Sequence, residues 1–143
     1  MPQVKFYETV EDSLLKFAVI ISHVGEKWVF CKHKDRDTYE IPGGHREPGE
    51  PILETARREL WEETGAVEFE MHPICVYSVT GRTRAVDSDE ETFGMLYHAR
   101  IISFEKELHS EIDRIELFDT LPEQWTYPQI QPLLIREYER RKQ

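Results

Sequence analysis

The hydrophobic residues near the start of the chain fall into two short continuous runs, Phe17–Ile21 and Trp28–Cys31. The first run lies within the strand-like stretch Lys16–Val24 and the second within Lys27–Lys34, and Gly25 lies in the turn between them. Short apolar runs bounded by turn residues are typical of buried strands. The pattern therefore predicts a β-hairpin whose two strands lie inside the protein.

Later segments predict further strands and helices. Strand-like runs cover 39–41, 67–79, 92–104 and 114–118, and the polar residues 80–91 predict a loop between two of these strands. An amphipathic C-terminal helix is predicted from the spacing of Ile130, Leu133, Leu134 and Tyr138. With one more helix at 50–64, and strands that are often apolar on both faces, the fold expected is an α/β/α sandwich. A length of 143 residues suits a single domain spanning 1–143.

The helix predicted at Glu50–Thr64 has clear end signals. Pro51 suits the first helical turn, because its missing N–H costs nothing there, and Gly65 suits the position just past the end. The apolar stripe that would dock this helix on a core consists of Ile52 or Leu53, Ala56 and Leu60.

The polar side of the same helix gathers carboxylates. Glu59, Glu62 and Glu63 stand at i, i+3 and i+4, so their side chains converge on one patch. Repulsion costs about 0.2 to 0.5 kcal/mol for each like-charged pair, and the nearby helix C-terminus disfavours each anion by roughly 0.3 to 1 kcal/mol. A bound cation would reverse both penalties, and oxygen ligands of this kind suit Mg²⁺. The alternative is a solvated acidic face.

Two neighbouring features favour a binding site over a solvated face. Arg58 lies four residues after Glu54 and four before Glu62, so it can orient the carboxylates from the flank. Ahead of the helix, Pro42–Gly44 provides a backbone that turns sharply and can aim carbonyl or N–H groups at a ligand.

Together these residues resemble the signature of the Nudix hydrolase family. The signature reads Gly, five residues, Glu, seven residues, Arg-Glu, a bulky aliphatic residue, one residue, Glu-Glu, one residue, Gly. It is met here by Gly44, Glu50, Arg58, Glu59, Leu60, Glu62, Glu63 and Gly65. Agreement at so many fixed positions is far more specific than a single short motif. One position departs, since the family has a bulky aliphatic residue after the last glycine and this chain has Ala66, which concerns local packing more than chemistry.

The resemblance implies a sandwich with a mixed central sheet over essentially the whole chain, and hydrolysis of a nucleoside diphosphate linked to another group. The implied cofactor is Mg²⁺, with Mn²⁺ as the alternative. The implied ligands are Glu59, Glu62 and Glu63 with the carbonyl of Gly43, and Arg58 completes the catalytic cluster. Glu50 would support the loop or the metal-bound waters. The general base is left open between a helix glutamate and a loop residue, the loop candidates being Glu90, Glu91, Glu105, Glu107 and Glu111.

Candidate substrate contacts lie close to the glycine loop in the sequence. Lys32 and Arg36, from the stretch before the loop, and His45 and Arg46 within it could bind phosphates, although a hairpin end kept soluble by its charges would look the same. The aromatic side chains placed best to stack on a base are Tyr77, Phe93 and Trp125, although aromatic residues at such positions more often belong to the core.

Composition narrows the class of partner. The formal net charge of −10 argues against a broad surface for a nucleic-acid polymer, which requires clustered Lys and Arg.

Cys31 and Cys75 are expected as buried reduced thiols, because neither has a CxxC motif or a histidine at metal spacing. The absence of a long apolar run and of a leader-like N-terminus predicts a cytoplasmic protein without a membrane span. The expected oligomeric state is a monomer or a homodimer. Dispersed histidines and the lack of a Gly-x-Ser-x-Gly elbow argue against zinc and serine-hydrolase chemistry.

The substrate branch is the least determined feature. Tyr39–Gly44 and the short length look most like family members that act on nucleoside triphosphates, including oxidised ones, although the chain has no Asn to read a purine. The alternatives are a nucleotide-sugar or dinucleoside-polyphosphate hydrolase, and a non-catalytic nucleotide sensor. A sensor is disfavoured because the glutamates of the signature are intact.

Overall fold

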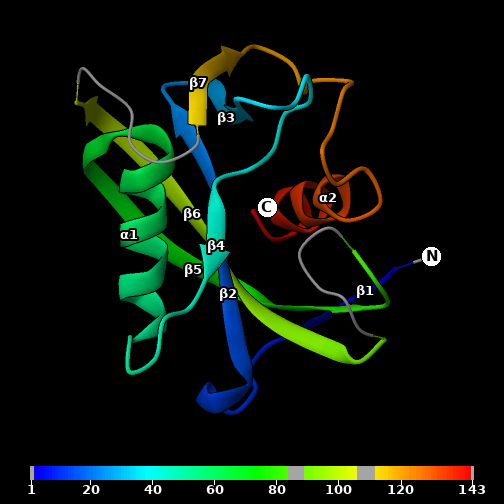
Figure 1. Ribbon diagram of the computed structural model, residues 1–143. Coiled ribbons are helices and arrows are strands. Elements are labelled where there is room, and N and C mark those ends of the chain that lie inside the picture. The colour runs from blue at the N-terminus through cyan, green and yellow to red at the C-terminus, as the bar shows by residue number, and fades with distance from the viewer. Residues whose placement is uncertain (1, 84–88, 106–111, 143) are drawn as a thin grey trace.

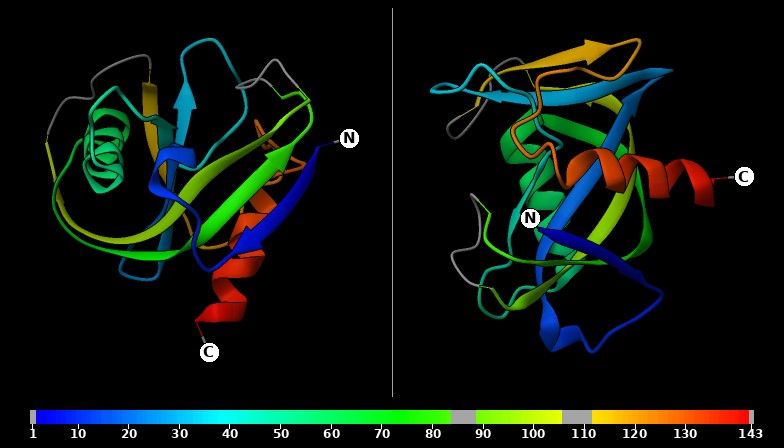
Figure 2. Two further views of the ribbon diagram at one scale, coloured as in Figure 1. Left: turned by 90° about the horizontal axis from the view of Figure 1, so that it is seen from below. Right: turned by 90° about the vertical axis from the view of Figure 1, so that its right-hand side faces the viewer.

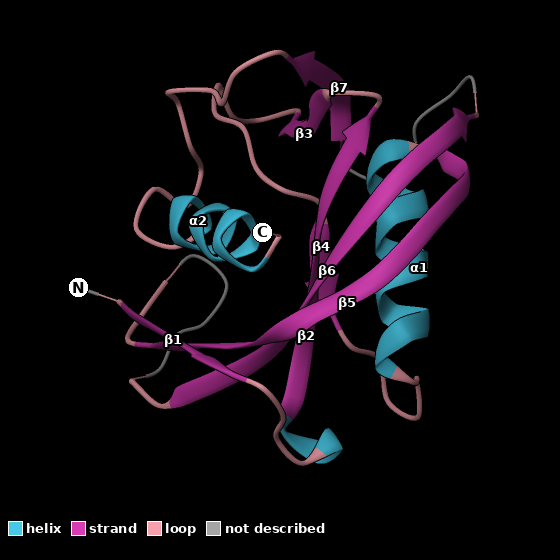
Figure 3. Ribbon diagram, turned by 180° about the vertical axis from the view of Figure 1, so that it is seen from behind, coloured by secondary structure: helices cyan, strands magenta, loops and turns pink. Residues whose placement is uncertain are grey.

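The computed structural model describes residues 2–83, 89–105 and 112–142, which form one twisted sheet between two α-helices (Figures 1 and 3). The helices are α1 (Ile52–Thr64) and α2 (Gln131–Arg141), and a 3-10 turn covers Asp12–Leu14. The strands are β1 (Gln3–Tyr7), β2 (Leu15–Val24), β3 (Lys27–His33), β4 (Gly43–His45), β5 (Ala66–Thr80), β6 (Glu91–Phe104) and β7 (Ile112–Phe118).

The sheet is mixed. Six of its seven strands follow the order β1-β5-β6-β2-β3-β7, and the seventh, β4, pairs with β2 off this path. Strands β2 and β6 run parallel, whereas the other pairs are antiparallel. One edge of β2 is shared, because β3 pairs with Ser22–Val24 and β4 pairs with Phe17–Val19. The glycine segment therefore lies against the middle of the sheet.

Alternate residues of β2 point to two separate cores. Val19 and Ile21 pack on the side of α2, with Leu134 and Ile135 of that helix, whereas Ala18 and Ile20 pack on the side of α1. Ala56 and Leu60, both fully buried, are the α1 residues of this second core. Because side chains alternate along a strand, a continuous apolar run serves both faces. The views of Figure 2 show the two helices on opposite faces of the sheet, and the predicted α/β/α sandwich with a mixed sheet is confirmed.

The ends of α1 follow from two residues. Pro51 is extended, with ψ of 143°, and its carbonyl accepts the N–H of Thr55, so the helix begins one residue later, at Ile52. Gly65 takes the left-handed conformation, with φ of 77°, and donates its N–H to the carbonyl of Trp61. Glycine adopts that conformation without the Cβ clash of other residues, so it ends the helix where the sequence predicts.

The strands of the structure differ from those expected at three places. The predicted strand 39–41 forms only isolated bridges, from Glu40 to Cys31 and from Tyr39 to Trp125. The predicted glycine loop contains strand β4, because the edge of β2 beyond its pairing with β3 leaves backbone groups that Gly43–His45 can bond. Strand β1, which has no strong apolar pattern, was not predicted and pairs with β5. The predicted hairpin is confirmed as β2 and β3, as are the strands β5, β6 and β7 with shifts of a residue or two at their ends.

Helix α2 is held to the sheet partly by a cluster of rings. His98 of β6 stacks on Tyr138 with a centroid distance of 4.9 Å and an interplanar angle of 9°. Nδ1 of His23 lies 2.9 Å from Nε2 of His98. Burial lowers the pKa of His98 to about 4, because the charged ring would lose hydration. Docking of α2 therefore involves a histidine pair that is neutral at pH 7.

Cys31 and Cys75 are buried free thiols, as the sequence predicts. Across the described ranges, none of the helices has the length and apolar character needed to cross a bilayer.

Candidate active site

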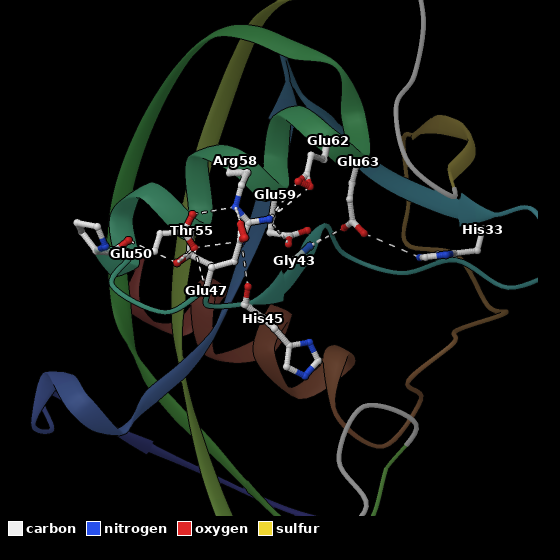
Figure 4. Close-up of polar contacts among 11 residues, drawn as sticks. His33, Gly43, His45, Glu47, Glu50, Thr55, Arg58, Glu59, Glu62 and Glu63 are labelled. Atoms are coloured by element: carbon white, nitrogen blue, oxygen red, sulfur yellow. Dashed lines mark hydrogen bonds and ion pairs between the residues drawn. The ribbon is translucent and has the colours of Figure 1, made fainter.

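Arg58 is the centre of the polar face of α1 (Figure 4). Its guanidinium donates to both oxygens of Glu50, with Nε 2.8 Å from Oε2 and an η nitrogen 3.0 Å from Oε1. The other η nitrogen lies 2.9 Å from Oε2 of Glu59 and 3.0 Å from Oε1 of Glu62. The carbonyl of His45, in β4, accepts a further bond at 3.0 Å. Arg58 thus ties two helix glutamates to Glu50 and to the glycine segment.

Glu50 fixes the entry into α1. Hydrogen bonds from Arg58 are the main reason that the pKa of Glu50 falls to about 2, so this carboxylate stays ionised at any physiological pH. Its Oε1 also accepts the hydroxyl of Thr55 at 2.7 Å and the N–H of Glu47 at 3.1 Å. The expected role of Glu50 in supporting the loop is in keeping with these contacts.

Glu59 lies directly against the backbone of Gly44. A Cβ added at Gly44 would overlap the carboxyl group of Glu59, so only glycine leaves room for this side chain. Burial raises the pKa of Glu59 to about 7, against the opposing effect of the Arg58 charge. The Glu59 carboxyl therefore lies against β4, and the positive charge of Arg58 does not fully offset the effect of burial on its pKa.

Glu63 turns toward the other side of the glycine strand. Its Oε1 accepts the N–H of Gly43 at 2.8 Å, and its Oε2 lies 3.9 Å from Nε2 of His33. The residue is only 8% exposed, and this burial raises the pKa of its carboxyl well above the usual range. This contact involves the N–H of Gly43 and not its carbonyl. The role of that carbonyl as a metal ligand stays a prediction.

The three helix glutamates do not form a ready-made triad. Glu59 and Glu62 share Arg58, whereas Glu63 faces Gly43, and no group of three His, Cys, Asp or Glu side chains among the described residues is arranged to hold a metal ion as it stands. The donor set nevertheless fits a hard cation, because Glu63 is buried and Glu59 partly buried, burial disfavours the ionised form of both carboxyls, and the charge of Glu59 further disfavours ionisation of Glu63. A divalent cation would remove that penalty, and it would compete with Arg58 for Glu59.

A cavity of about 340 Å³ opens beside these glutamates. Glu59, Glu63, Gly43 and Gly44 line one end of it, on β4 and α1. The opposite end is lined largely by apolar and aromatic side chains from the sheet and α2, among them Tyr77, Val79, Tyr127, Ile130 and Leu134. The cavity therefore joins an acidic end to an apolar end, and its volume is in the range of small-molecule sites.

The four predicted phosphate contacts separate into two pairs. Arg36 and His45 line the cavity, whereas Lys32 and Arg46 are not among its lining residues. The Arg46 guanidinium donates to the carbonyls of Glu50 and Leu15 and forms an ion pair of 2.8 Å with Asp12. These contacts anchor the loop before α1 to the start of β2.

The loop candidates for a general base lie in different parts of the chain's structure, and some lie outside the described residues. Oε2 of Glu91 accepts the hydroxyls of Tyr7 and Ser78, and Ser78 alternates with Tyr77, so Glu91 lies on the sheet face away from the cavity. The backbone of Glu105 bonds to the carbonyl of Gly65, just past α1. Glu90 precedes β6, and Glu107 and Glu111 lie outside the described residues.

Of the three aromatic candidates, Tyr77 lines the cavity. Phe93 lies beside Tyr7, with ring centroids 5.6 Å apart, and Trp125 packs edge-on against Phe30 in the core on the α2 side.

Two buried polar residues of the cavity, Glu40 and Gln131, were not predicted. Glu40 is 7% exposed, and its carboxylate lies 3.1 Å from Arg36 and 3.4 Å from His33. Gln131, at the start of α2, is also buried, and its Oε1 accepts the N–H of Ile41 at 2.8 Å. A charged residue inside the short strand-like motif 39–41 was the available signal for Glu40, whereas nothing in the sequence marks Gln131.

The fold and this site agree with what is found in known proteins. The chain belongs to the NUDIX domain family, which matches residues 14–134, and the family resemblance of the sequence is thereby confirmed.

Particular relatives extend this result. Over 109 residues the chain is 36% identical to YtkD of Bacillus subtilis (strain 168), named as a candidate 8-oxo-dGTP diphosphatase. That match covers 76% of this chain and 65% of YtkD, so the chain spans just under two thirds of that relative's length. A mutant form of the pyrophosphohydrolase BsRppH from Bacillus subtilis has a TM-score of 0.77 and 28% identity, covering 97% of this chain and 90% of that chain. A NUDIX hydrolase from Nitrosomonas europaea, at a TM-score of 0.70 and 20% identity over 88% and 89% of the two chains, shares the fold.

Proposed function

We propose that the protein is a pyrophosphohydrolase that depends on a divalent cation, Mg²⁺ or Mn²⁺, and cleaves a nucleoside triphosphate, including oxidised forms. The observation that carries this proposal is the cavity itself, which is lined both by the carboxylates of Glu59 and Glu63 and by apolar side chains of the sheet and α2. A nucleoside triphosphate has the matching polarity, with a metal-binding phosphate chain at one end and a largely apolar base at the other. The names of YtkD and BsRppH support the same reaction class.

In this proposal Glu59 and Glu63 are the cation ligands that face the cavity, and Glu62 joins them from beside Arg58. Arg58 is a positioning residue, because its planar fork can hold Glu50 and Glu59 in fixed orientations. The N–H of Gly43 holds the remaining ligand, Glu63, through Oε1.

A divalent cation bound there would neutralise phosphate oxygens and acidify a water molecule. The protein's own groups supply orientation and charge. Arg36 carries a cation at the cavity wall, held at 3.1 Å by Glu40, and can contact the phosphate chain. His45, on β4, also lines the cavity, and its carbonyl accepts a hydrogen bond from Arg58.

Two alternatives remain as candidate functions. A nucleotide-sugar or dinucleoside-polyphosphate hydrolase would use the same glutamates with a different occupant of the apolar end. A non-catalytic nucleotide sensor would retain the cavity without turnover. The intact and partly buried carboxylates argue against the sensor, because burying them is costly in a protein that does not use them.

The test is a hydrolysis screen of the purified chain with Mg²⁺ across nucleoside triphosphates, oxidised triphosphates, nucleotide sugars and dinucleoside polyphosphates, with detection of phosphate and pyrophosphate. We expect turnover of triphosphates, loss of that turnover in Glu63→Gln, and normal turnover in Glu54→Gln, which changes an exposed glutamate of the same helix. Turnover of nucleotide sugars alone would replace the proposed substrate, and no turnover of any class would favour the sensor.

A further inference from the structure

Four strands place one transverse row of residues along the cavity. The register pairs Tyr77 of β5 with Gly94 of β6, Gly94 with Phe17 of β2, and Phe17 with His45 of β4. Tyr77, Phe17 and His45 all line the cavity, and the rings of Phe17 and His45 lie 4.6 Å apart. The row thus contains three rings and one residue without a side chain.

The missing side chain at Gly94 is occupied by its neighbour. A Cβ built on Gly94 would lie 2.6 Å from both Cζ and Oη of Tyr77 and 2.7 Å from Cε1. The outer end of the Tyr77 ring therefore rests on the backbone of β6, where any other residue would push it away. Positive φ values occur at Gly25, Gly49, Gly65 and Gly81 but not at Gly94, so backbone conformation does not require glycine at position 94. Glycine is required there because the Tyr77 ring approaches the backbone so closely.

The position of the ring bears on the cavity. Tyr77 is 5% exposed, and its hydroxyl end lies at the middle of the row, between β5 and the strands that carry Phe17 and His45. Burial raises the pKa of the phenol well above its usual range, so the ring is neutral at any physiological pH. A neutral ring that lies along the sheet presents an apolar wall to a planar group, whereas a ring displaced from Gly94 would occupy cavity volume.

We propose that Gly94 is a specificity-determining residue, because it admits the Tyr77 ring against β6 and so keeps the cavity deep enough for a nucleobase beside the row of Tyr77, Phe17 and His45. This inference rests on the proposed function and deepens it. The contact between Gly94 and Tyr77 would select for a base, whereas the cation held by the glutamate cluster would recognise the phosphates.

The experiment compares two ligands that differ in the base. Calorimetry at fixed Mg²⁺ gives the dissociation constants of a non-hydrolysable nucleoside triphosphate analogue and of inorganic tripolyphosphate, for the wild type, Gly94→Ala and Tyr77→Phe. The control is Gly25→Ala, in the β2–β3 turn and outside the cavity lining, where an added Cβ meets nothing within 4 Å but the left-handed φ of 59° strains a residue other than glycine. This variant therefore reports a loss of stability that leaves the cavity unchanged. Thermal melting of each variant checks that it is folded.

We expect the wild type to prefer the nucleotide over tripolyphosphate. The preference should fall about fivefold or more in Gly94→Ala, since stacking on an aromatic ring is worth roughly this factor or more, and stay within about twofold of the wild type in Gly25→Ala. Tyr77→Phe removes only the hydroxyl, so it should keep the preference if the ring matters as an apolar wall.

Three outcomes would contradict the inference. An unchanged preference in folded Gly94→Ala would show that Gly94 does not set the depth of the cavity. If Gly94→Ala does not fold, loss of the preference in Tyr77→Phe would show that a hydroxyl contact selects the base and would overturn the proposal equally. Equal binding of both ligands by the wild type would overturn it while leaving phosphate recognition intact, whereas binding of neither ligand would overturn the proposed function itself.

Discussion

Arg58→Lys tests the positioning role of the guanidinium. Arg58 forms hydrogen bonds of 2.8 to 3.0 Å with Glu50, Glu59, Glu62 and the carbonyl of His45. Five such bonds are present, and an ammonium group donates at most three, so at least two are lost. A bond to a charged group contributes about 1.5 to 3 kcal/mol, and less where water reaches it, as it does at this side chain, which is 25% exposed.

We therefore expect a loss of roughly 1.5 to 3 kcal/mol of orienting energy at the carboxylates. Steady-state kinetics with Mg²⁺ and a nucleoside triphosphate should show kcat/KM reduced at least about tenfold, the equivalent of about 1.4 kcal/mol in barrier. Thermal melting should show a smaller effect, about 1 kcal/mol, because a lysine retains the charge and some of the contacts.

The matched control is Arg57→Lys. Arg57 is exposed, lies one position away on α1 and points about 100° away around the helix axis. Its substitution should change neither kcat/KM nor stability. Similar kinetics for the two variants would refute the positioning role and leave Arg58 as an ordinary surface charge.

Other substitutions probe the same site and the fold around it. Glu62→Gln or Glu63→Gln should lower turnover by orders of magnitude while metal-free melting temperatures stay level or rise, because a like-charge conflict is removed. Gly44→Ala should lower kcat at least about tenfold with a stability change within about 1 kcal/mol, measured by kinetics and melting, because the new methyl displaces the Glu59 carboxyl. Since its pKa is lowered from 6.5 to about 4, His98 stabilises the fold above pH 6.5 and loses this effect as the pH falls to 4. Because the raised pKa values of Glu59 and Glu63 act in the opposite direction over this range, the test is the difference in unfolding free energy between the wild type and His98→Gln, which should fall by about 1 to 2 kcal/mol as the pH falls, allowing for partial exposure.

Local chemistry explains why much of this site could be predicted from sequence. The spacing of Glu59, Glu62 and Glu63 requires one helix face, and Gly65 ends that helix for a conformational reason that needs no tertiary information. The apolar runs on both sides of Gly25 likewise predict a buried hairpin, which is present.

Features that depend on strand register could not be predicted in the same way. His45 and Arg46 are neighbours in sequence, but the pairing of β4 with β2 leaves His45 at the cavity, whereas the Arg46 guanidinium bonds to Asp12 and Leu15. The role proposed for Gly94 depends on the Tyr77 side chain of the neighbouring strand, which the sequence alone does not place beside it. The convergence of the glutamates on one patch is likewise modified by contacts from other segments, since Gly43 binds one carboxylate and Arg58 binds the others.

The proposed binding of a divalent cation by the carboxylates of α1 is tested most directly by a titration with Mn²⁺ followed by electron paramagnetic resonance. Free Mn²⁺ gives the signal, so binding is measured without nucleotide or turnover. We expect the wild type and Glu54→Gln to remove Mn²⁺ from solution alike, whereas the double variant Glu59→Gln and Glu63→Gln, once shown to be folded, should bind Mn²⁺ at least about tenfold more weakly. Equal Mn²⁺ binding by the double variant and the wild type would contradict the claim.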